Sequence, residues 1–321
     1  MNIKLGVIMD PINTINKEKD STIAVLIAAQ ERNYQIYYIK INDLYLYSGK
    51  SYATTKRITF FKNCQQWFSL NKQQEIPLSF LDVILIRKNP PFDLTFLYAT
   101  QILEFAEKQE NVLMINKPKS LRDCNEKIFA SYFTKIIPNT LITNKTLQIK
   151  NFYKKYKDII FKPLDGMGGS SIFRVKPNDP NFSVIIETMT KNNTSYCMVQ
   201  SYIPDIKNGD KRILILHGHP IPYCLARIPQ NNETRGNLAA GGKARPQQLD
   251  ENDYKISNII SPILQKKGLL FVGIDVIGKK LTEINVTSPT GICEIEKFFS
   301  ISITKIFLKG IEKLLKKNKI N

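Results

Sequence analysis

The sequence predicts a mixed α/β protein in which an open parallel sheet at the N-terminus precedes lobes of α+β character. In the first third of the chain, short apolar runs alternate with amphipathic stretches, which is typical of βαβ units in a parallel sheet. Beyond residues 117–123 this alternation changes, and strand-like segments are joined by turns rather than by helices. With 321 residues, of which 43% are hydrophobic, the chain is long enough for two domains with separate cores.

The N-terminal part contains one helix with a clear start signal. Asp20 or Ser21 can cap a helix that runs to about Arg32. Its apolar residues, beginning with Ile23 and Leu26, recur at helical spacing. A second helix is expected at residues 94–108, and strands at 3–9, 35–39, 81–86 and 112–115.

Past the change of pattern, the chain reads as short strands around a glycine-rich loop. A helix at about 124–133 and a lysine-rich stretch come first. The following order is a strand at 158–162, a loop at 165–171, a strand at 172–175, a helix at about 181–190 and a strand at 195–200. Two hairpins are then expected, 211–216 with 221–227 and 270–276 with 281–286.

The cysteines and the apolar segments bear on where the protein works. The five cysteines show no C-x-x-C pair and no zinc spacing, so we expect reduced and mostly buried thiols in a reducing compartment. No stretch approaches the roughly 20 apolar residues that span a bilayer, and the N-terminus lacks a signal-peptide layout. A cytoplasmic protein is therefore expected.

The net charge of +18 raises the possibility of a nucleic-acid-binding protein. Lysines are scattered through every segment, however, which favours a composition bias over a single binding face. The one cluster lies at 313–319 on a helix-like pattern and is expected to be a solvated face. Anionic substrates, such as nucleotides and peptides with carboxylates, would still benefit from the charge, and neither nucleic acid nor membrane is expected as a partner.

The segment 165–171, Asp-Gly-Met-Gly-Gly-Ser-Ser, can hold a phosphate. Gly166, Gly168 and Gly169 let backbone N–H groups turn inward without obstruction by Cβ atoms. The segment lacks the P-loop layout, and a strand follows it where a dinucleotide fingerprint needs a helix. We interpret it as a flap that closes over phosphates, while a tight hairpin remains an equally good explanation of the glycines alone.

Asp275, Glu283 and Asn285 are predicted to share one face of a hairpin. Glu283 and Asn285 are two positions apart on a strand, so both side chains project from the same face. If residues 278–280 form a three-residue loop, Asp275 lies opposite Glu283 with Cβ atoms about 5 Å apart. Two carboxylates and an amide oxygen suit a pair of Mg²⁺ ions that bridge ATP phosphates. The alternative, an exposed charged hairpin, is disfavoured by flanking residues that read as buried.

Two further arginines are candidates because of their positions. Residues 228–243 have few apolar anchors and read as a mobile loop, whose Arg235 would reach a site only on closure. Arg87 follows a buried-looking strand, at the edge where open α/β sheets bind ligands. No Ser/His/Asp or Cys/His arrangement is apparent, which is consistent with a substrate carboxylate that itself attacks ATP.

Taken together, these segments resemble the bacterial glutathione synthetases of the ATP-grasp superfamily. The resemblance runs in order from the first strand to about residue 310. The Arg-Lys-x-Pro-Pro-Phe-Asp segment and the Thr-Arg-Gly-Asn-Leu loop are specific to this family, whereas single motifs recur across ATP-grasp enzymes. The matching segments are residues 6–11, 87–93, 116–127, 162–169, 209–212, 226–229, 234–242 and 282–289.

The resemblance implies an ATP-dependent carboxylate–amine ligase. ATP would phosphorylate the cysteinyl carboxylate of γ-glutamylcysteine, the amine of glycine would attack the acyl phosphate, and glutathione, ADP and phosphate would leave. Another ATP-grasp ligase with a different acid or amine is the nearest alternative, and a basic nucleic-acid-binding protein is a more distant one. The resemblance also implies two Mg²⁺ or Mn²⁺ ions and a homotetramer.

The resemblance assigns roles to residues at matching positions. Nucleotide-binding residues would be Lys127, Lys162, Gly166, Gly168, Gly169, Gln200, Ser201, Ile203 and Asp210, with the backbone of Ser201 and Ile203 reading the adenine edge. Metal ligands would be Asp275, Glu283 and Asn285. Catalytic residues would be Arg212, Arg227 and Arg235, while Arg87 and Ser288 would bind the dipeptide. Cys293 stands where the family usually carries arginine.

The implied architecture is an N-terminal α/β substrate domain at residues 1–122, followed by a two-lobed ATP-grasp domain at 123–316. Residues 123–200 would form the ATP-binding lobe. Residues 201–316 would form the catalytic lobe, with the mobile loop at 228–243.

Overall fold

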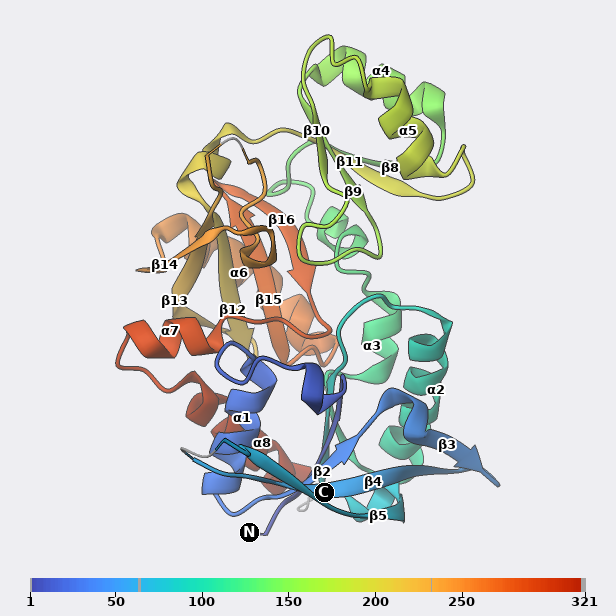
Figure 1. The fold of residues 1–321 in the computed structure, drawn as a ribbon, viewed down its shortest axis with the longest axis vertical. Coiled ribbons are helices and arrows are strands. Elements are labelled where there is room, and N and C mark those ends of the chain that lie inside the picture. Colours follow the sequence, from blue (N-terminus) through green and yellow to red (C-terminus); the bar gives the residue numbers. More distant parts are fainter. Residues whose placement is uncertain (1, 63–64, 232, 319–321) are drawn as a thin grey trace.

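The computed structural model describes residues 2–62, 65–231 and 233–318. Within these ranges the chain forms three β-sheets with helices packed against them, and the sheets follow one another along the long axis of the molecule (Figure 1). The predicted α/β class is therefore confirmed. Cys64, Lys319 and position 232, which belongs to the loop expected at 228–243, lie outside the described residues.

The first sheet contains the predicted parallel strands. Its order is β3-β4-β2-β1-β6-β7, and β5 pairs with β4. Strands β2, β1, β6 and β7 are parallel neighbours, which confirms the open parallel sheet. The strands are β1 Lys4–Met9, β2 Gln35–Ile39, β3 Leu44–Tyr47, β4 Lys50–Phe60, β5 Phe68–Pro77, β6 Val83–Arg87 and β7 Leu113–Ile115.

The antiparallel strands β3, β4 and β5 were not expected. The inward positions of β4 include Ser51, Ala53 and Thr55, so the strand lacks the alternation of large apolar residues that predicts a sheet. The two hydroxyl groups are buried but satisfied: Ser51 Oγ donates to the carbonyl of Ile102 and Thr55 Oγ1 to that of Tyr38, each at 2.8 Å. Strand β5 is mainly polar and exposed, which hides it from a pattern search.

Helices cover the parallel sheet as expected, and the C-terminal helix returns to it. Helix α1 spans Ser21–Glu31 with Asp20 as its N-cap, and α2 spans Leu94–Gln109. Helix α8, Ile303–Asn318, lies against α1, and Arg32 donates to Glu312 on α8 at 2.8 and 2.9 Å. The lysines at 313, 316 and 317 are exposed, so the expected solvated face is confirmed for these residues.

The helix expected at 124–133 is wrong. Helix α3 occupies Pro118–Asp123, and residues 128–132 form a 3-10 helix. Between them Asn125 Oδ1 accepts from the backbone N–H groups of Lys127 and Ile128, at 3.1 and 3.0 Å. An asparagine side chain that caps the following residues in this way competes with continuation of the helix.

The second sheet is small and wholly antiparallel, in the order β10-β9-β11-β8. Its strands are β8 Thr140–Thr143, β9 Ile159–Pro163, β10 Phe173–Val175 and β11 Cys197–Ser201. Helices α4 Thr146–Tyr156 and α5 Phe182–Thr190 pack on it around a separate core (Figure 1). The lysine-rich stretch of the sequence forms α4, which buries only Ile149 and so carries little apolar signal.

The third sheet contains the two predicted hairpins, in the order β14-β13-β12-β15-β16. Its strands are β12 Asp210–Leu216, β13 His219–Ile228, β14 Lys243–Gln248, β15 Phe271–Ile277 and β16 Lys280–Asn285. Helices α6 Glu251–Lys266 and α7 Ile292–Phe298 belong to the same part of the chain. Among the described helices, none is long and apolar enough to cross a bilayer.

The four described cysteines are free, and all but Cys293 are buried. Burial raises the pKa of Cys197 to about 11 and the pKa values of Cys224 and Cys293 to about 12. Since the thiolate is the nucleophile, we expect iodoacetamide at pH 8 to leave these three thiols unmodified in the native protein. Peptide mass spectrometry should find them alkylated only after unfolding in urea, and labelling of native Cys293 would contradict this prediction.

Candidate active site

The glycine-rich loop joins β9 to β10, and Phe173 pairs antiparallel with Phe161 across it. The strand–loop–strand arrangement predicted for this segment is thus confirmed. At Gly169 φ is +81°, and a Cβ atom there would lie 2.6 Å from Oδ1 of Asn237. Glycine is required here because the segment between β13 and β14 passes directly against the loop.

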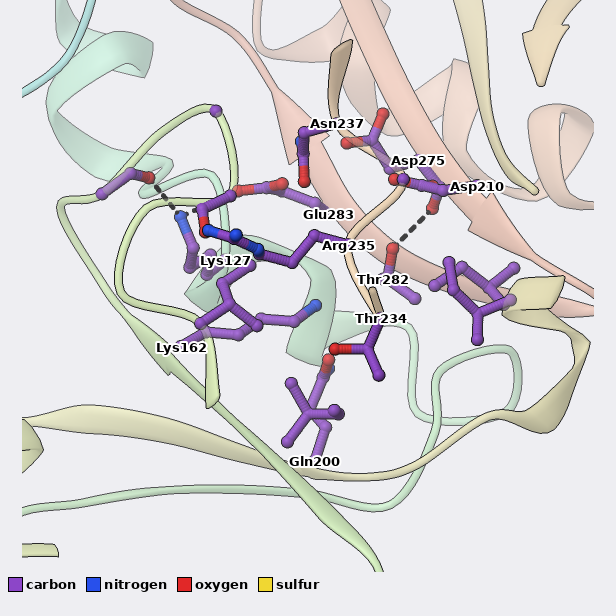
Figure 2. Close-up of a pocket in the computed structure, with 18 of the residues that line it drawn as sticks. Lys127, Lys162, Gln200, Asp210, Thr234, Arg235, Asn237, Asp275, Thr282 and Glu283 are labelled. Carbon is purple, nitrogen blue, oxygen red and sulfur yellow. Dashed lines mark hydrogen bonds and ion pairs between the residues drawn. The ribbon is translucent and has the colours of Figure 1, made fainter. Parts of the chain in front are cut away.

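A pocket lies between this loop and the third sheet, and it gathers most of the predicted site residues (Figure 2). Arg87, Arg227 and Ser288 are not among the residues that line it. The predicted residues that line it are Lys127, Lys162, Gly166, Gly168, Gly169, Gln200, Ser201, Ile203, Asp210, Arg212, Arg235, Asp275, Glu283 and Asn285.

The two lysines of the pocket have different electrostatic surroundings. Lys127 Nζ donates to the carbonyl of Gly166 at 2.7 Å and forms an ion pair with Glu283 at 2.9 Å. Burial disfavours the charge of Lys127, but the Glu283 carboxylate outweighs burial and raises the lysine's pKa. Burial lowers the pKa of Lys162, for which the described residues supply no ion pair. Lys162 is therefore the ammonium with most to gain from an anionic ligand.

Four buried charged residues alternate in sign on the third sheet, and all of them except Arg227 line the pocket. Asp210 lies opposite Arg227, and Arg212 lies opposite Asp275, in adjacent strand pairs. Arg212 holds Asp275 through two bonds of 2.6 and 3.1 Å, and Arg227 contacts Asp275 at 3.0 Å and also Asp210. The two arginines and two aspartates thus compensate one another's charge.

The aspartates of this group respond differently to burial. Burial opposes ionisation of Asp275, but the charges of Arg212 and Arg227 outweigh it, so the pKa of Asp275 lies well below its ordinary value. Burial raises the pKa of Asp210, and Oδ1 of this residue has no hydrogen-bond partner among the described residues. A buried acceptor without a partner, at the wall of a pocket, is suited to a ligand hydroxyl.

The predicted pairing of Asp275 with Glu283 is confirmed, although the turn that was used to predict it is wrong. Ile277 pairs with Lys280, so the loop contains two residues and not three. A bulge between Asp275 and Val276 adds the missing step and restores the pairing of Asp275 with Glu283. The bulge therefore compensates for the shorter loop.

Glu283 and Asn285 present oxygen atoms that suit a divalent cation. Asn285 donates through Nδ2 to the carbonyl of Gly273 at 3.2 Å, which leaves its Oδ1 free to face the pocket. Asp275 already accepts three hydrogen bonds from arginines, so its carboxylate oxygens have fewer lone pairs left for a cation. Carboxylate and amide oxygens are preferred by Mg²⁺ and Mn²⁺. Across the described ranges, no three His, Cys, Asp or Glu side chains cluster closely enough to hold a metal by themselves.

The segment between β13 and β14 covers the pocket. Arg235 donates to the carbonyl of Gly169 at 3.2 Å and pairs with Glu233. Figure 2 shows Arg235 extending over the pocket near Lys127 and Lys162, on the side opposite Asp210 and Asp275. A Cβ at Gly236 would lie 2.2 Å from the carbonyl oxygen of Arg227, so this glycine allows the segment to lie directly on β13.

The other end of the pocket is mainly apolar. Ile160, Ile172 and Ile206 line it beside the predicted residues Gln200, Ser201 and Ile203. Gln200 donates to Thr140 at 3.1 Å. The backbone N–H of Ser201 donates to the carbonyl of Asn139 at 2.9 Å, so the carbonyl of Ser201 is the group available to a ligand. An apolar slot edged by backbone polar groups suits a flat heterocycle.

Arg87 is buried at the carboxyl end of β6. It donates to Thr22 Oγ1 at 3.0 Å and to the carbonyl of Pro289 at 2.7 Å, and its guanidinium stacks on Phe271. Burial lowers the pKa of Arg87 to about 10, and its Nη1 has no partner in the described part of the chain. Half-buried Ser288 immediately precedes Pro289.

Cys293 is the second residue of helix α7, which begins at Ile292, and it lies near the start of α1. Its thiol donates to the carbonyl of Asp20 at 3.5 Å. The position at which arginine was expected therefore faces the N-cap of α1.

Sequence reasoning missed several residues of the pocket. Glu126, Thr234, Asn237 and Thr282 all line it. Glu126 could have been noticed, because it directly precedes the predicted phosphate-binding Lys127 in the Asn-Glu-Lys segment. Burial raises the pKa of Glu126, and the negative charge of Glu283 raises it further.

Comparison with known proteins decides the family. The model for the N-terminal domain of prokaryotic glutathione synthetase matches residues 3–122, and the model for the ATP-grasp domain of the same family matches residues 126–300. The chain belongs to the prokaryotic glutathione synthetase family. The expected resemblance is thus confirmed, and the chain is an ATP-dependent ligase of the ATP-grasp type.

Curated members of the prokaryotic glutathione synthetase family are similar along the whole chain. Glutathione synthetase of Buchnera aphidicola subsp. Acyrthosiphon pisum is 58% identical over 98% of this chain and 98% of its own length. Glutathione synthetase of Escherichia coli K12 is 56% identical over 97% of this chain and 98% of its own length.

Solved structures of more distant proteins share the fold of this chain. D-cycloserine synthetase DcsG aligns with a TM-score of 0.65 at 12% identity, over 98% of this chain and 99% of its own. The ATP-grasp ligase PsnB, in complex with a minimal precursor, Mg and ADP, aligns with a TM-score of 0.62 at 12% identity, over 97% and 98% of the two chains. ATP-grasp ligases generally use ATP and divalent metal ions.

Proposed function

We propose that this site joins γ-glutamylcysteine to glycine at the expense of ATP and releases glutathione, ADP and phosphate. The observation that carries the proposal is the convergence of Lys127, Lys162, Glu283 and Asn285 on the glycine-rich loop, in a family of glutathione synthetases. The γ-phosphoryl group of ATP would pass to the cysteinyl carboxylate. The amine of glycine would then displace phosphate from the resulting acyl phosphate.

The proposed nucleotide site runs from the apolar slot to the glycine-rich loop. Adenine would lie in the slot beside Gln200, with the carbonyl of Ser201 and the N–H of Ile203 at its edge. The unpartnered Oδ1 of Asp210 supports a hydrogen bond with the ribose or a nearby polar group. Lys127 and Lys162 would neutralise phosphate charge, and Gly166, Gly168 and Gly169 would leave room for the phosphate oxygens.

Divalent ions would be held by Glu283 and Asn285, with Asp275 as a further ligand. We propose two ions, Mg²⁺ or Mn²⁺, because three oxygen-bearing side chains lie on one face of β15 and β16. When bound, the ions draw charge from the phosphate oxygens. Lys127, which pairs with Glu283 at 2.9 Å, would then contact both the nucleotide and a metal ligand.

The arginines would stabilise the negative charge that develops as the phosphoryl group transfers. Arg212 and Arg227 are held by Asp275 and so are preorganised, which lowers the cost of aligning them. Arg235 would shield the acyl phosphate from water, since its segment covers the pocket. Arg87, which carries an unpartnered Nη1, and Ser288 would orient the dipeptide.

We also propose the division into an N-terminal domain at 1–122 and a two-lobed ATP-grasp domain at 123–316, with lobes at 123–200 and 201–316. The matches of the two family models to residues 3–122 and 126–300 support it. A homotetramer and a cytoplasmic location are further proposals, and both rest on the family resemblance.

ADP release tests the function directly. With ATP, Mg²⁺, γ-glutamylcysteine and glycine together, we expect stoichiometric ADP and glutathione, and omission of the dipeptide should abolish release. Omission of glycine should leave at most a slow release of ADP. The acyl phosphate can then react only with water, and the site shields it from water. Turnover only with other acid–amine pairs would keep the ligase chemistry and replace the substrates, whereas no turnover with any pair would contradict the proposal.

A further inference from the structure

The exit of strand β16 connects two proposed functional residues, the metal ligand Asn285 and the dipeptide-binding Ser288. Only Val286 and Thr287 lie between them. Strand β16 is the edge of the third sheet, so the backbone groups on its outer side have no neighbouring strand. Such an edge must find other hydrogen-bond partners if its geometry is to be defined.

Glu126 supplies these partners at the exit of β16, whereas Leu281 near its start donates to the carbonyl of Ile136 at 2.8 Å. One oxygen of its carboxylate, Oε1, accepts from Val286 N at 2.9 Å, Thr287 N at 3.0 Å and Thr287 Oγ1 at 2.8 Å. The backbone carbonyl of Glu126 accepts from Ile284 N at 2.9 Å. Glu126 therefore contacts the strand on both sides of Asn285 and takes the place of a neighbouring strand.

The backbone carbonyl of Val286 is held as well. The carbonyl of Val286 accepts from Asn116 Nδ2 at 2.6 Å, and Asn116 is buried. Val286 is thus fixed through its N–H by Glu126 and through its carbonyl by Asn116. This explains how an edge strand can present Asn285 and Ser288 at a defined separation.

We propose that Glu126 is a positioning residue, whose carboxylate sets the geometry of the metal-binding strand at its exit. It acts through Val286 and Thr287, and not by touching the reacting atoms. The proposal rests on the proposed function, because Asn285 and Ser288 have their roles there. It predicts that the reach of the side chain matters more than its charge, since three hydrogen bonds converge on one oxygen.

A comparison of three substitutions separates reach from charge. Glu126→Gln keeps an acceptor oxygen at the same distance from the backbone, whereas Glu126→Asp keeps the charge but is shorter by about 1.5 Å. We expect Glu126→Asp and Glu126→Ala to weaken Mn²⁺ binding, and to lower kcat/KM for γ-glutamylcysteine, by about 10- to 100-fold. Glu126→Gln should lose less than about fivefold, because only the charge assistance of the bonds is removed.

The measurements are Mn²⁺ binding by electron paramagnetic resonance in the presence of a non-hydrolysable ATP analogue, and the separate kcat and KM values. Glu251→Asp and Glu251→Gln are matched controls, since the Glu251 side chain is 86% exposed on α6. Melting curves verify folding. Should Glu126→Asp fail to fold, Thr287→Val, which removes one of the three bonds to Oε1, should still weaken Mn²⁺ binding by about threefold.

The order of the effects decides the outcome. If Glu126→Gln is as damaging as Glu126→Asp, or more so, the charge acts on the ligand directly and the positioning role is wrong. Unchanged Mn²⁺ binding in all variants would also overturn it. Failure of the proposed function is distinguishable from failure of this proposal. The wild type would then lack turnover with γ-glutamylcysteine and glycine, whereas Mn²⁺ binding could still be compared between the wild type and the Glu126 variants.

Discussion

Glu283→Gln should lower the rate of ADP formation by about 100- to 1000-fold, the effect of removing one group that stabilises transition-state charge. The substitution preserves size but removes the charge that pairs with Lys127 at 2.9 Å and that would bind the cation. ADP release with ATP, Mg²⁺, γ-glutamylcysteine and glycine measures the loss. Raising the concentration of Mg²⁺ or Mn²⁺ should restore only part of the rate, because the missing carboxylate also orients Lys127.

The control for this prediction is Glu251→Gln, the same chemical change at an exposed position of α6. It should retain the wild-type rate. The melting temperature of Glu283→Gln should stay within a few degrees of the wild type, because the lost repulsion between Glu283 and Glu126 offsets the lost ion pair between Glu283 and Lys127. A Glu283→Gln enzyme that keeps more than about a fifth of the wild-type rate would rule out a central role for this carboxylate.

Asn116→Leu should destabilise the protein more than any other single change considered. Asn116 accepts from the N–H groups of Leu270 and Phe271 at 2.7 and 2.9 Å, and it donates to the carbonyls of Phe271 and Val286 at 2.9 and 2.6 Å. Leucine has a similar size but would leave four backbone groups without these partners, three of them in buried residues and one in the half-buried Leu270. At about 1 to 3 kcal/mol for each unsatisfied group, we expect a loss of at least about 4 kcal/mol.

Urea unfolding followed by circular dichroism measures the loss. Asn258→Leu is the matched control, because Asn258 is exposed in the middle of α6, and it should change stability by less than about 0.5 kcal/mol. If Asn116→Leu unfolds at the same urea concentration as the control, the four hydrogen bonds of the Asn116 side chain contribute little to stability.

Local pattern predicted much of the fold. Helix α1 with its Asp20 cap, helix α2, and strands β1, β2, β9 and β10 were all anticipated, because their signals lie within a few neighbouring residues. Strands β3, β4 and β5 were missed, since β4 buries small and polar residues and β5 is a polar edge. The helix expected at 124–133 failed because Asn125 caps the backbone instead of extending a helix.

In the candidate site, too, local sequence signals predicted some features and missed others. The three glycines were predicted from the composition of their loop, the Asp275–Glu283 pair from register, and Lys127 and Lys162 from the family resemblance. All of them line one pocket. The pairing was predicted with a three-residue loop, whereas the chain reaches it with a two-residue loop and a bulge. The side chains that must share a face thus predict the register of two strands, even where the length of the loop between them is predicted wrongly.

The sequence by itself determined the family, the α/β class and the residue types of the site, because motifs and periodicity are local properties of the chain. Only the tertiary structure decided how these residues are held. Glu126 contacts Val286 across 160 positions of sequence, and Asn116 contacts it across 170. No periodicity encodes such contacts, because they depend on how the edge of one sheet meets the segment that follows another.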